Sequence, residues 1–188
     1  MSTPVLTVAN LLTMSRMGLA PLLVVLILQG EMRWAFAVFV IAGFTDLLDG
    51  LIARWGQQQT TLGAMLDPVA DKILLTASCV ALTWTSGLRT SLPAWLTVVT
   101  LSRDAIIIVA VVVVNLTLGR RVFYPSILGK LATLSQLVSV GLVLLLNALD
   151  VSWRPAMLLF QFTVAITIAS ALHYAYLGTV KRGEVPPA

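Results

Sequence analysis

The chain has 188 residues, of which 59% are hydrophobic and only 11% are charged. Soluble domains average about 25% charged residues, and the mean hydropathy here is +0.97. The composition therefore predicts an integral membrane protein with a single domain over residues 1–188. The formal net charge is +4. Basic residues near the ends of membrane spans account for this excess without a nucleic-acid partner.

Six apolar stretches, separated by short polar or turn-forming links, predict an all-α bundle of six transmembrane helices. We expect spans at residues 8–28, 34–54, 62–84, 93–118, 126–149 and 156–177. Six spans place both termini on one side. That side has more basic residues in its connections (Arg54, Arg120, Arg121, Lys130, Lys181 and Arg182) than the other side has (Arg33, Arg89 and Arg154). The bias predicts cytoplasmic termini, with the protein in the inner (cytoplasmic) membrane.

Four carboxylates are concentrated in one window that is flanked by apolar sequence. Asp46 and Asp49 lie at the end of the second predicted helix, and Asp67 and Asp71 lie at the start of the third. At 100° per residue, each pair shares a helix face, so two helices joined by the link 55–61 would point four carboxylates at each other. Unpaired acids repel and are costly in a low dielectric. Because Mg²⁺, Mn²⁺ and Ca²⁺ require hard oxygen ligands, we predict a metal site in the membrane.

The spacing of these residues resembles the pattern of the CDP-alcohol phosphotransferases, D-x-x-D-G-x-x-A-R, eight residues, then G-x-x-x-D-x-x-x-D. Every fixed position is met by D-L-L-D-G-L-I-A-R and G-A-M-L-D-P-V-A-D. The resemblance implies an active site between the second and third spans, open to the cytoplasm. There a CDP-linked lipid binds, an acceptor hydroxyl attacks the lipid-bound phosphorus, and CMP leaves. It also implies CDP-diacylglycerol as donor, one or two Mg²⁺ or Mn²⁺ ions as cofactors, surrounding membrane lipids and a homodimer.

The same resemblance implies roles for individual residues. Asp46, Asp49 and Asp67 would be the principal metal ligands. Asp71 would be the general base as well as a ligand. The CDP-lipid pocket would be lined by small residues that leave room for substrate, an arginine that holds phosphate, and an asparagine from the first helix: Gly50, Ala53, Gly63, Arg54 and Asn10. Arg16 is equally compatible with the site and with snorkelling to the headgroups.

Arg103 and Asp104 lie near the bilayer midplane in the fourth predicted span, and charges at that depth are functional candidates. Either the two neutralise each other, or Arg103 meets an anionic substrate. Adjacent helical residues point about 100° apart, which makes a mutual pair awkward. The family resemblance implies acceptor-binding cations on the later helices, so we expect Arg103 and Lys130 to bind the acceptor. His173, the single histidine, is expected to be a packed residue without a catalytic role.

Within the family, the chain resembles most the branch with glycerol-type acceptors, which holds phosphatidylglycerophosphate synthases and CMP-forming cardiolipin synthases. The former usually have Glu after the fourth-span arginine and a second Lys two places after Lys130. Here those positions hold Asp104 and Ala132. Fewer acceptor-side cations suit a phosphodiester, so we expect phosphatidylglycerol as the acceptor, with glycerol 3-phosphate as the alternative.

A non-enzymatic function is the remaining alternative. A six-span protein with intramembrane acids could be a divalent-metal transporter or a lipid-binding membrane protein. Transporters commonly have internal repeats and charges spread along a path. Here no repeat is visible, and the acids cluster at one end of two helices, which favours the enzyme.

Overall fold

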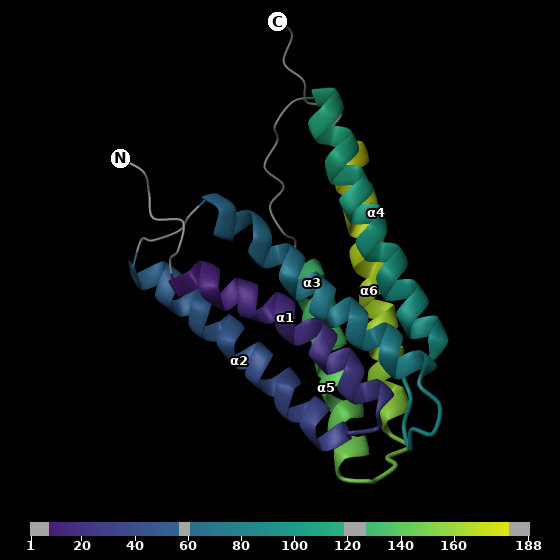
Figure 1. Ribbon diagram of the computed structural model, residues 1–188. Coiled ribbons are helices and arrows are strands. Elements are labelled where there is room, and N and C mark those ends of the chain that lie inside the picture. Colours follow the sequence, from purple (N-terminus) through teal and green to yellow (C-terminus); the bar gives the residue numbers. More distant parts are fainter. Residues whose placement is uncertain (1–7, 57–60, 119–126, 181–188) are drawn as a thin grey trace, which may run out of the picture. The chain divides into compact units, whose positions relative to one another are not determined.

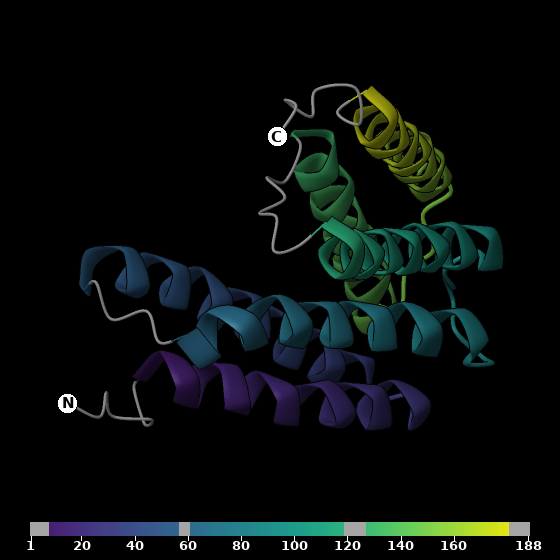
Figure 2. The same ribbon diagram turned by 90° about the horizontal axis from the view of Figure 1, so that it is seen from above.

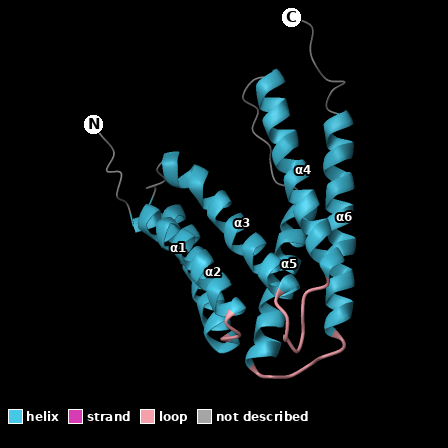
Figure 3. Ribbon diagram, turned by 45° about the vertical axis from the view of Figure 1, so that its right-hand side comes forward, coloured by secondary structure: helices cyan, strands magenta, loops and turns pink. Residues whose placement is uncertain are grey.

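The computed structural model describes residues 8–56, 61–118 and 127–180, and within them the side chains of residues 18–45, 72–109 and 127–173. Throughout this described part every regular element is an α-helix (Figures 1 and 3). The helices are α1 (Val8–Leu28), α2 (Met32–Gly56), α3 (Thr61–Trp84), α4 (Ala94–Leu118), α5 (Ile127–Ala148) and α6 (Ala156–Val180). Each predicted span coincides with one helix. The largest difference is at the end of α6, which continues to Val180.

Two helical segments of the described chain are long and apolar enough to cross a membrane, namely Ile127–Ala148 and Ala156–His173. Shorter apolar helical segments occur at Gly18–Leu28, Met32–Thr45 and Lys72–Trp84. Large apolar side chains are exposed on these helices, among them Phe44 and Leu172. This distribution is typical of a protein whose outer surface faces lipid, because water would not favour so many exposed apolar groups.

The chain divides into two compact units. Unit 1 consists of Met1–Leu92 and Val140–Trp153, so it contains α1, α2, α3 and the second half of α5. In this unit α1 packs against both α2 and α3 (Figure 2). Its core is apolar and includes side chains that are fully buried: Leu23, Ile27, Ala35, Ala42, Cys79, Leu82, Val140, Val143 and Leu144. On α5, a Cβ at Gly141 would lie 3.3 Å from the ring of Phe39, so glycine permits this close packing.

Unit 2 consists of Pro93–Ser139 and Arg154–Ala188, so it contains α4, the first half of α5 and α6. Here α4 and α6 pack side by side (Figure 1). The interior is polar, with buried hydroxyls, an amide and two charges at Thr97, Thr100, Arg103, Asp104, Ser135, Gln136, Ser139, Thr163, Thr167 and Ser170. Several hydroxyls donate to a carbonyl one turn earlier, as Thr100 does to Leu96 at 2.9 Å. The hydroxyls of Ser139 and Thr163, 3.0 Å apart, join α5 to α6. Such bonds satisfy polar groups that lipid could not solvate.

Candidate active site

The four aspartates of the motif lie in two consecutive helices of unit 1. Asp46 and Asp49 belong to α2, and Asp67 and Asp71 belong to α3, so their prediction as helical residues is confirmed. Their side chains lie outside the described residues, and the metal site they would form stays a prediction. Among the side chains that are described, no three His, Cys, Asp or Glu residues are grouped so that they could hold a metal ion.

The helix bounds put these aspartates at similar distances along α2 and α3 from one end of unit 1. The end of α1, the start of α2 and the end of α3 share one end of unit 1, because they line the same cavity there. At 1.5 Å per residue from that end, Asp46 and Asp49 lie about 21–26 Å along α2, and Asp71 and Asp67 lie about 20–26 Å along α3. Asn10 lies about 27 Å along α1 by the same measure. The predicted metal ligands and Asn10 therefore lie at similar distances from that end, each measured along its own helix.

The other predicted CDP-lipid residues lie near the end of α2 and the start of α3. Gly50, Ala53 and Arg54 are in the last turns of α2, and Gly63 is in the first turn of α3. Their side-chain surroundings are outside the described residues, as are those of Arg16 in α1. Their roles in substrate binding accordingly stay predictions.

The two charged residues on α4, Arg103 and Asp104, form an ion pair with each other. Arg103 Nη1 lies 2.8 Å from Asp104 Oδ1, with exposed side-chain fractions of 8% and 12% respectively. The expectation that adjacent helical residues pair poorly was wrong. The angle between successive Cβ directions limits short side chains, but the long arginine side chain can turn back to its neighbour.

Two further groups hold the guanidinium of Arg103. Its Nη2 donates to Ser170 Oγ on α6 at 3.1 Å and lies 3.5 Å from the carbonyl oxygen of Gly129 on α5. The third nitrogen of the guanidinium, Nε, is buried and has no hydrogen-bond partner in the described structure. Arg103 thus connects three helices of unit 2, while its buried Nε–H has no hydrogen-bond partner in the described structure.

Lys130, the second predicted acceptor contact, directly follows Gly129 and is exposed. The carbonyl contact of Arg103 with Gly129 therefore brings the two cationic residues into one neighbourhood of unit 2. His173 is partly buried on α6, one turn beyond Ser170. Sequence reasoning missed Ser170, since a lone serine in an apolar helix gives no local sign of a partner 67 residues away.

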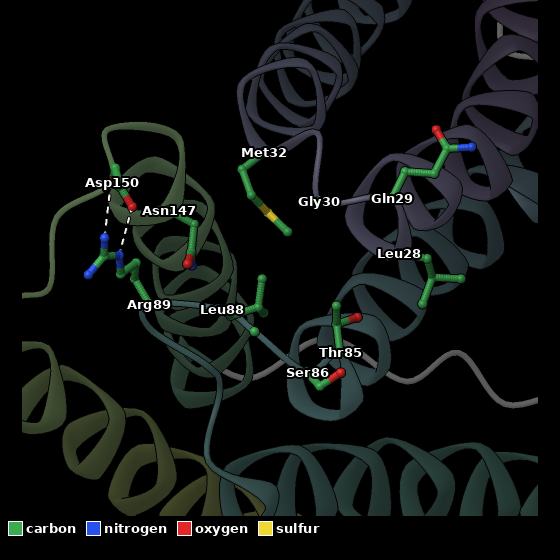
Figure 4. Close-up of a pocket in the computed structure, with 11 residues that line it drawn as sticks. Leu28, Gln29, Gly30, Met32, Thr85, Ser86, Leu88, Arg89, Asn147 and Asp150 are labelled. Carbon is green, nitrogen blue, oxygen red and sulfur yellow. Dashed lines mark hydrogen bonds and ion pairs between the residues drawn. The ribbon is translucent and has the colours of Figure 1, made fainter.

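A separate polar cavity of about 350 Å³ lies at the end of unit 1 that is remote from the aspartates (Figure 4). Its walls come from the α1–α2 turn, the segment after α3 and the end of α5. There Asn147 Nδ2 donates to the carbonyl oxygen of Thr90 at 2.7 Å, and the Thr90 N–H donates back to Asn147 Oδ1 at 3.2 Å. Arg89 forms an exposed, two-pronged contact with Asp150, at 2.8 and 3.3 Å. These contacts fasten loops, and they do not coincide with the predicted site.

Comparison with known proteins agrees with the motif. The family model for CDP-alcohol phosphatidyltransferase matches residues 6–173. The human CMP-forming cardiolipin synthase is 37% identical over 191 residues, which cover 92% of this chain and 62% of that protein. The CMP-forming cardiolipin synthase of Streptomyces coelicolor is 39% identical over 151 residues, 75% of this chain and 66% of that protein.

A relative with another name is also similar. The probable phosphatidylglycerophosphate synthase of Mycobacterium tuberculosis is 35% identical over 144 residues, which cover 73% of this chain and 65% of that protein. The chain thus spans about three fifths of the length of the human relative and somewhat more of the bacterial ones. The family match covers most of the chain, including the motif residues of α2 and α3 as well as Arg103 and its partners Asp104, Gly129 and Ser170. The chain therefore belongs to the CDP-alcohol phosphatidyltransferase family.

Proposed function

We propose that the protein transfers a phosphatidyl group from CDP-diacylglycerol to a glycerol hydroxyl of phosphatidylglycerol, which forms cardiolipin and releases CMP. The new bond joins the acceptor oxygen to the lipid-bound phosphorus, and the bond from that phosphorus to the CMP oxygen breaks. The observation that supports this proposal is the family motif with its four aspartates, two in α2 and two in α3, in a chain that belongs to this family. The similarity to the human and Streptomyces cardiolipin synthases supports the choice of acceptor.

The proposed metal ligands are Asp46, Asp49, Asp67 and Asp71. A donor set made only of carboxylate oxygens fits one or two Mg²⁺ or Mn²⁺ ions, since these cations prefer oxygen ligands. When bound, such ions supply Lewis-acid stabilisation of the pyrophosphate and of the charge that develops on CMP. Asp71, the last of the four, accepts the proton from the acceptor hydroxyl.

The remaining motif residues bind the CDP-lipid in this proposal. Gly50, Ala53 and Gly63 leave space for the nucleotide beside the helices, because they carry small side chains or none. Arg54 can hold a phosphate through two parallel N–H donors. Asn10, in the first turn of α1, contributes an amide that can form a hydrogen bond with the CDP-lipid.

Acceptor binding is assigned to Arg103 and Lys130. Their common neighbourhood at Gly129 supports a joint role. Asp104 balances the charge of Arg103, so the pair offers less net positive charge than a phosphate monoester would require. This favours phosphatidylglycerol, a phosphodiester, over glycerol 3-phosphate. Glycerol 3-phosphate remains the second candidate because of the similarity to a probable phosphatidylglycerophosphate synthase.

In the membrane, we propose that all six helices cross. They contain 21 to 25 residues, and a hydrocarbon core of about 30 Å needs about 20 helical residues. The basic connections then place both termini and the α2–α3 link in the cytoplasm, where the active site opens. A single domain over residues 1–188, placement in the inner membrane and a homodimer complete the proposal.

The direct test of the reaction class is metal-dependent release of CMP from CDP-diacylglycerol by the purified protein. An enzyme of this class releases CMP when Mg²⁺ or Mn²⁺ and an acceptor are supplied, and stops when EDTA is added in excess. A metal transporter or a non-catalytic lipid-binding protein would release no CMP under either condition.

A further inference from the structure

A second cavity, of about 230 Å³, lies in unit 2 between α4 and α6. Most of its lining is apolar and includes Val98, Ile106, Ile168 and Leu172, and the polar side chains in the lining are Ser102, Arg103 and Thr167. These four side chains are 46–67% exposed, so the cavity opens at the outer surface of the unit, where the proposed membrane would meet it. A lipid could therefore enter the cavity directly from the membrane, without passing through water.

Arg103 contributes the charged side chain in this lining. Its two terminal nitrogens are held by Asp104 and Ser170, whereas the buried Nε has no hydrogen-bond partner within the described structure. A buried N–H of a cationic group without an acceptor is destabilising, and native structures nearly always pair such groups. The arrangement therefore calls for an oxygen atom from a molecule that enters the cavity.

The chemistry of the cavity selects among possible occupants. A water molecule needs two to four polar partners. Besides Arg103, the lining contains two hydroxyls, Ser102 and Thr167, and the Thr167 hydroxyl already donates to the Thr163 carbonyl oxygen. A soluble sugar phosphate would lose its hydration against the same lining without sufficient compensation. A lipid fits the cavity better than either of these molecules. Its acyl chain matches the apolar surface, and its ester or phosphodiester oxygens can accept a hydrogen bond from Nε of Arg103.

We propose that this cavity binds an acyl chain of the acceptor lipid, while Nε of Arg103 donates to an oxygen of the same molecule. Asp104 and Ser170 are the positioning residues that fix the guanidinium. The proposal rests on the proposed function in one respect, because the lipid is taken to be phosphatidylglycerol. It adds that the acceptor is recognised partly through its chain, which excludes glycerol 3-phosphate from this site.

Photo-cross-linking of the full chain in phosphatidylcholine nanodiscs tests the site without turnover. The probe is phosphatidylglycerol with a diazirine in one acyl chain, and the same diazirine in phosphatidylcholine reports ordinary surrounding lipid. We expect phosphatidylglycerol to label the segments 98–106 and 167–172 in excess over phosphatidylcholine. Equal labelling by the two lipids would overturn the proposal.

Substitutions that fill the cavity test the site further, and a control substitution on the same helix outside the cavity accompanies them. Ala171 lines the cavity, whereas Ala165 is exposed on the same helix and does not. Ala171→Phe should reduce the phosphatidylglycerol-specific labelling about tenfold, and Ala165→Phe should leave it unchanged. If Ala171→Phe does not fold, Ala171→Leu provides a smaller filling group. Unchanged labelling in a folded Ala171 variant would contradict the site.

The positioning role of Ser170 has its own control. Ser139 is also a fully buried serine with a hydrogen bond between helices, but its partners are Thr163 and the carbonyl oxygen of Ser135. We expect Ser170→Ala to raise the KM for phosphatidylglycerol about five- to tenfold, the loss of roughly one hydrogen bond to a charged group. Ser139→Ala should leave this KM unchanged, and Ser170→Thr should restore it. An equal rise in both alanine variants would assign Ser170 to packing alone.

The labelling and activity experiments distinguish a failure of this lipid site from a failure of the proposed function. Specific labelling by phosphatidylglycerol in a protein that releases no CMP would remove the catalytic proposal and retain the lipid site. Cardiolipin formation without specific labelling of α4 and α6 would retain the reaction and remove the site.

Discussion

Arg103 and Asp104 are adjacent residues of α4 that form a buried ion pair, with Nη1 and Oδ1 2.8 Å apart. Ser170 and the Gly129 carbonyl provide further contacts to the same guanidinium. Arg103 consequently has a structural role in addition to the proposed acceptor contact. Removal of one charge from a buried pair costs about 3–5 kcal/mol, because the other charge remains in a low dielectric without its counterion.

A double substitution separates the two roles of Arg103. Asp104→Asn and Arg103→Gln should each lower the melting temperature in detergent, since each leaves one buried charge. The double variant should recover most of that loss because it buries no net charge. If Arg103 contacts the acceptor, the double variant should still show a kcat/KM for phosphatidylglycerol that is about ten- to hundredfold lower. A normal kcat/KM in the stable double variant would show that Arg103 has a structural role only.

The proposed metal ligands can be tested one at a time. Asp46→Asn, Asp49→Asn and Asp67→Asn preserve side-chain size but weaken the oxygen donor and remove its charge. We expect each to reduce CMP release by at least about 100-fold, because metal stabilisation supplies several kcal/mol to the transition state. Activity at different Mg²⁺ and Mn²⁺ concentrations is the measurement. Near-normal turnover in any one variant would remove that residue from the ligand set.

Asp71 should behave differently from the other three aspartates if it is the base. Asp71→Asn should still bind CDP-diacylglycerol, whereas kcat should fall by about 100-fold or more. Equilibrium binding of the donor together with single-turnover CMP release distinguishes the two effects. Loss of donor binding with normal turnover at saturation would show that Asp71 is a binding residue instead.

The remote end of unit 1 provides a prediction about stability. Asn147→Ala removes both side-chain bonds to the Thr90 backbone and should destabilise the protein by about 1–3 kcal/mol, since it leaves part-buried polar groups unpaired. Arg89→Ala breaks the ion pair between Arg89 and Asp150, whose side chains are 63% exposed for Arg89 and 70% exposed for Asp150. That loss should be below about 1 kcal/mol, because solvent screens exposed charges. Thermal unfolding in one detergent compares the two, and a larger effect for Arg89→Ala would contradict this ranking.

The helices could be predicted well from the sequence because long apolar runs are separated by polar, glycine- or proline-containing links. The start of α1 at Val8 and the end of α3 at Trp84 coincide with the prediction. Local composition determines these elements, since a backbone in lipid must satisfy its own hydrogen bonds. The motif residues Asp46 and Asp71 were accordingly placed on the correct helices.

Contacts between distant segments were beyond sequence reasoning. Asn147 bonds to Thr90 across 57 residues, and Ser170 bonds to Arg103 across 67. Neither pair has a local pattern, because tertiary packing alone brings the partners together. The Arg103–Asp104 pair was missed for another reason. Helix geometry predicts the direction of Cβ, but the several torsions of arginine determine where its guanidinium lies.

Product analysis tests the central claim most directly. The purified protein is given CDP-diacylglycerol and Mg²⁺ or Mn²⁺, with phosphatidylglycerol and glycerol 3-phosphate offered in parallel reactions, and the lipid products and CMP are quantified. We predict equal amounts of cardiolipin and CMP with phosphatidylglycerol, little product with glycerol 3-phosphate, and neither product in EDTA. Formation of phosphatidylglycerophosphate alone would contradict the acceptor assignment, and failure to release CMP with either acceptor would contradict the account as a whole.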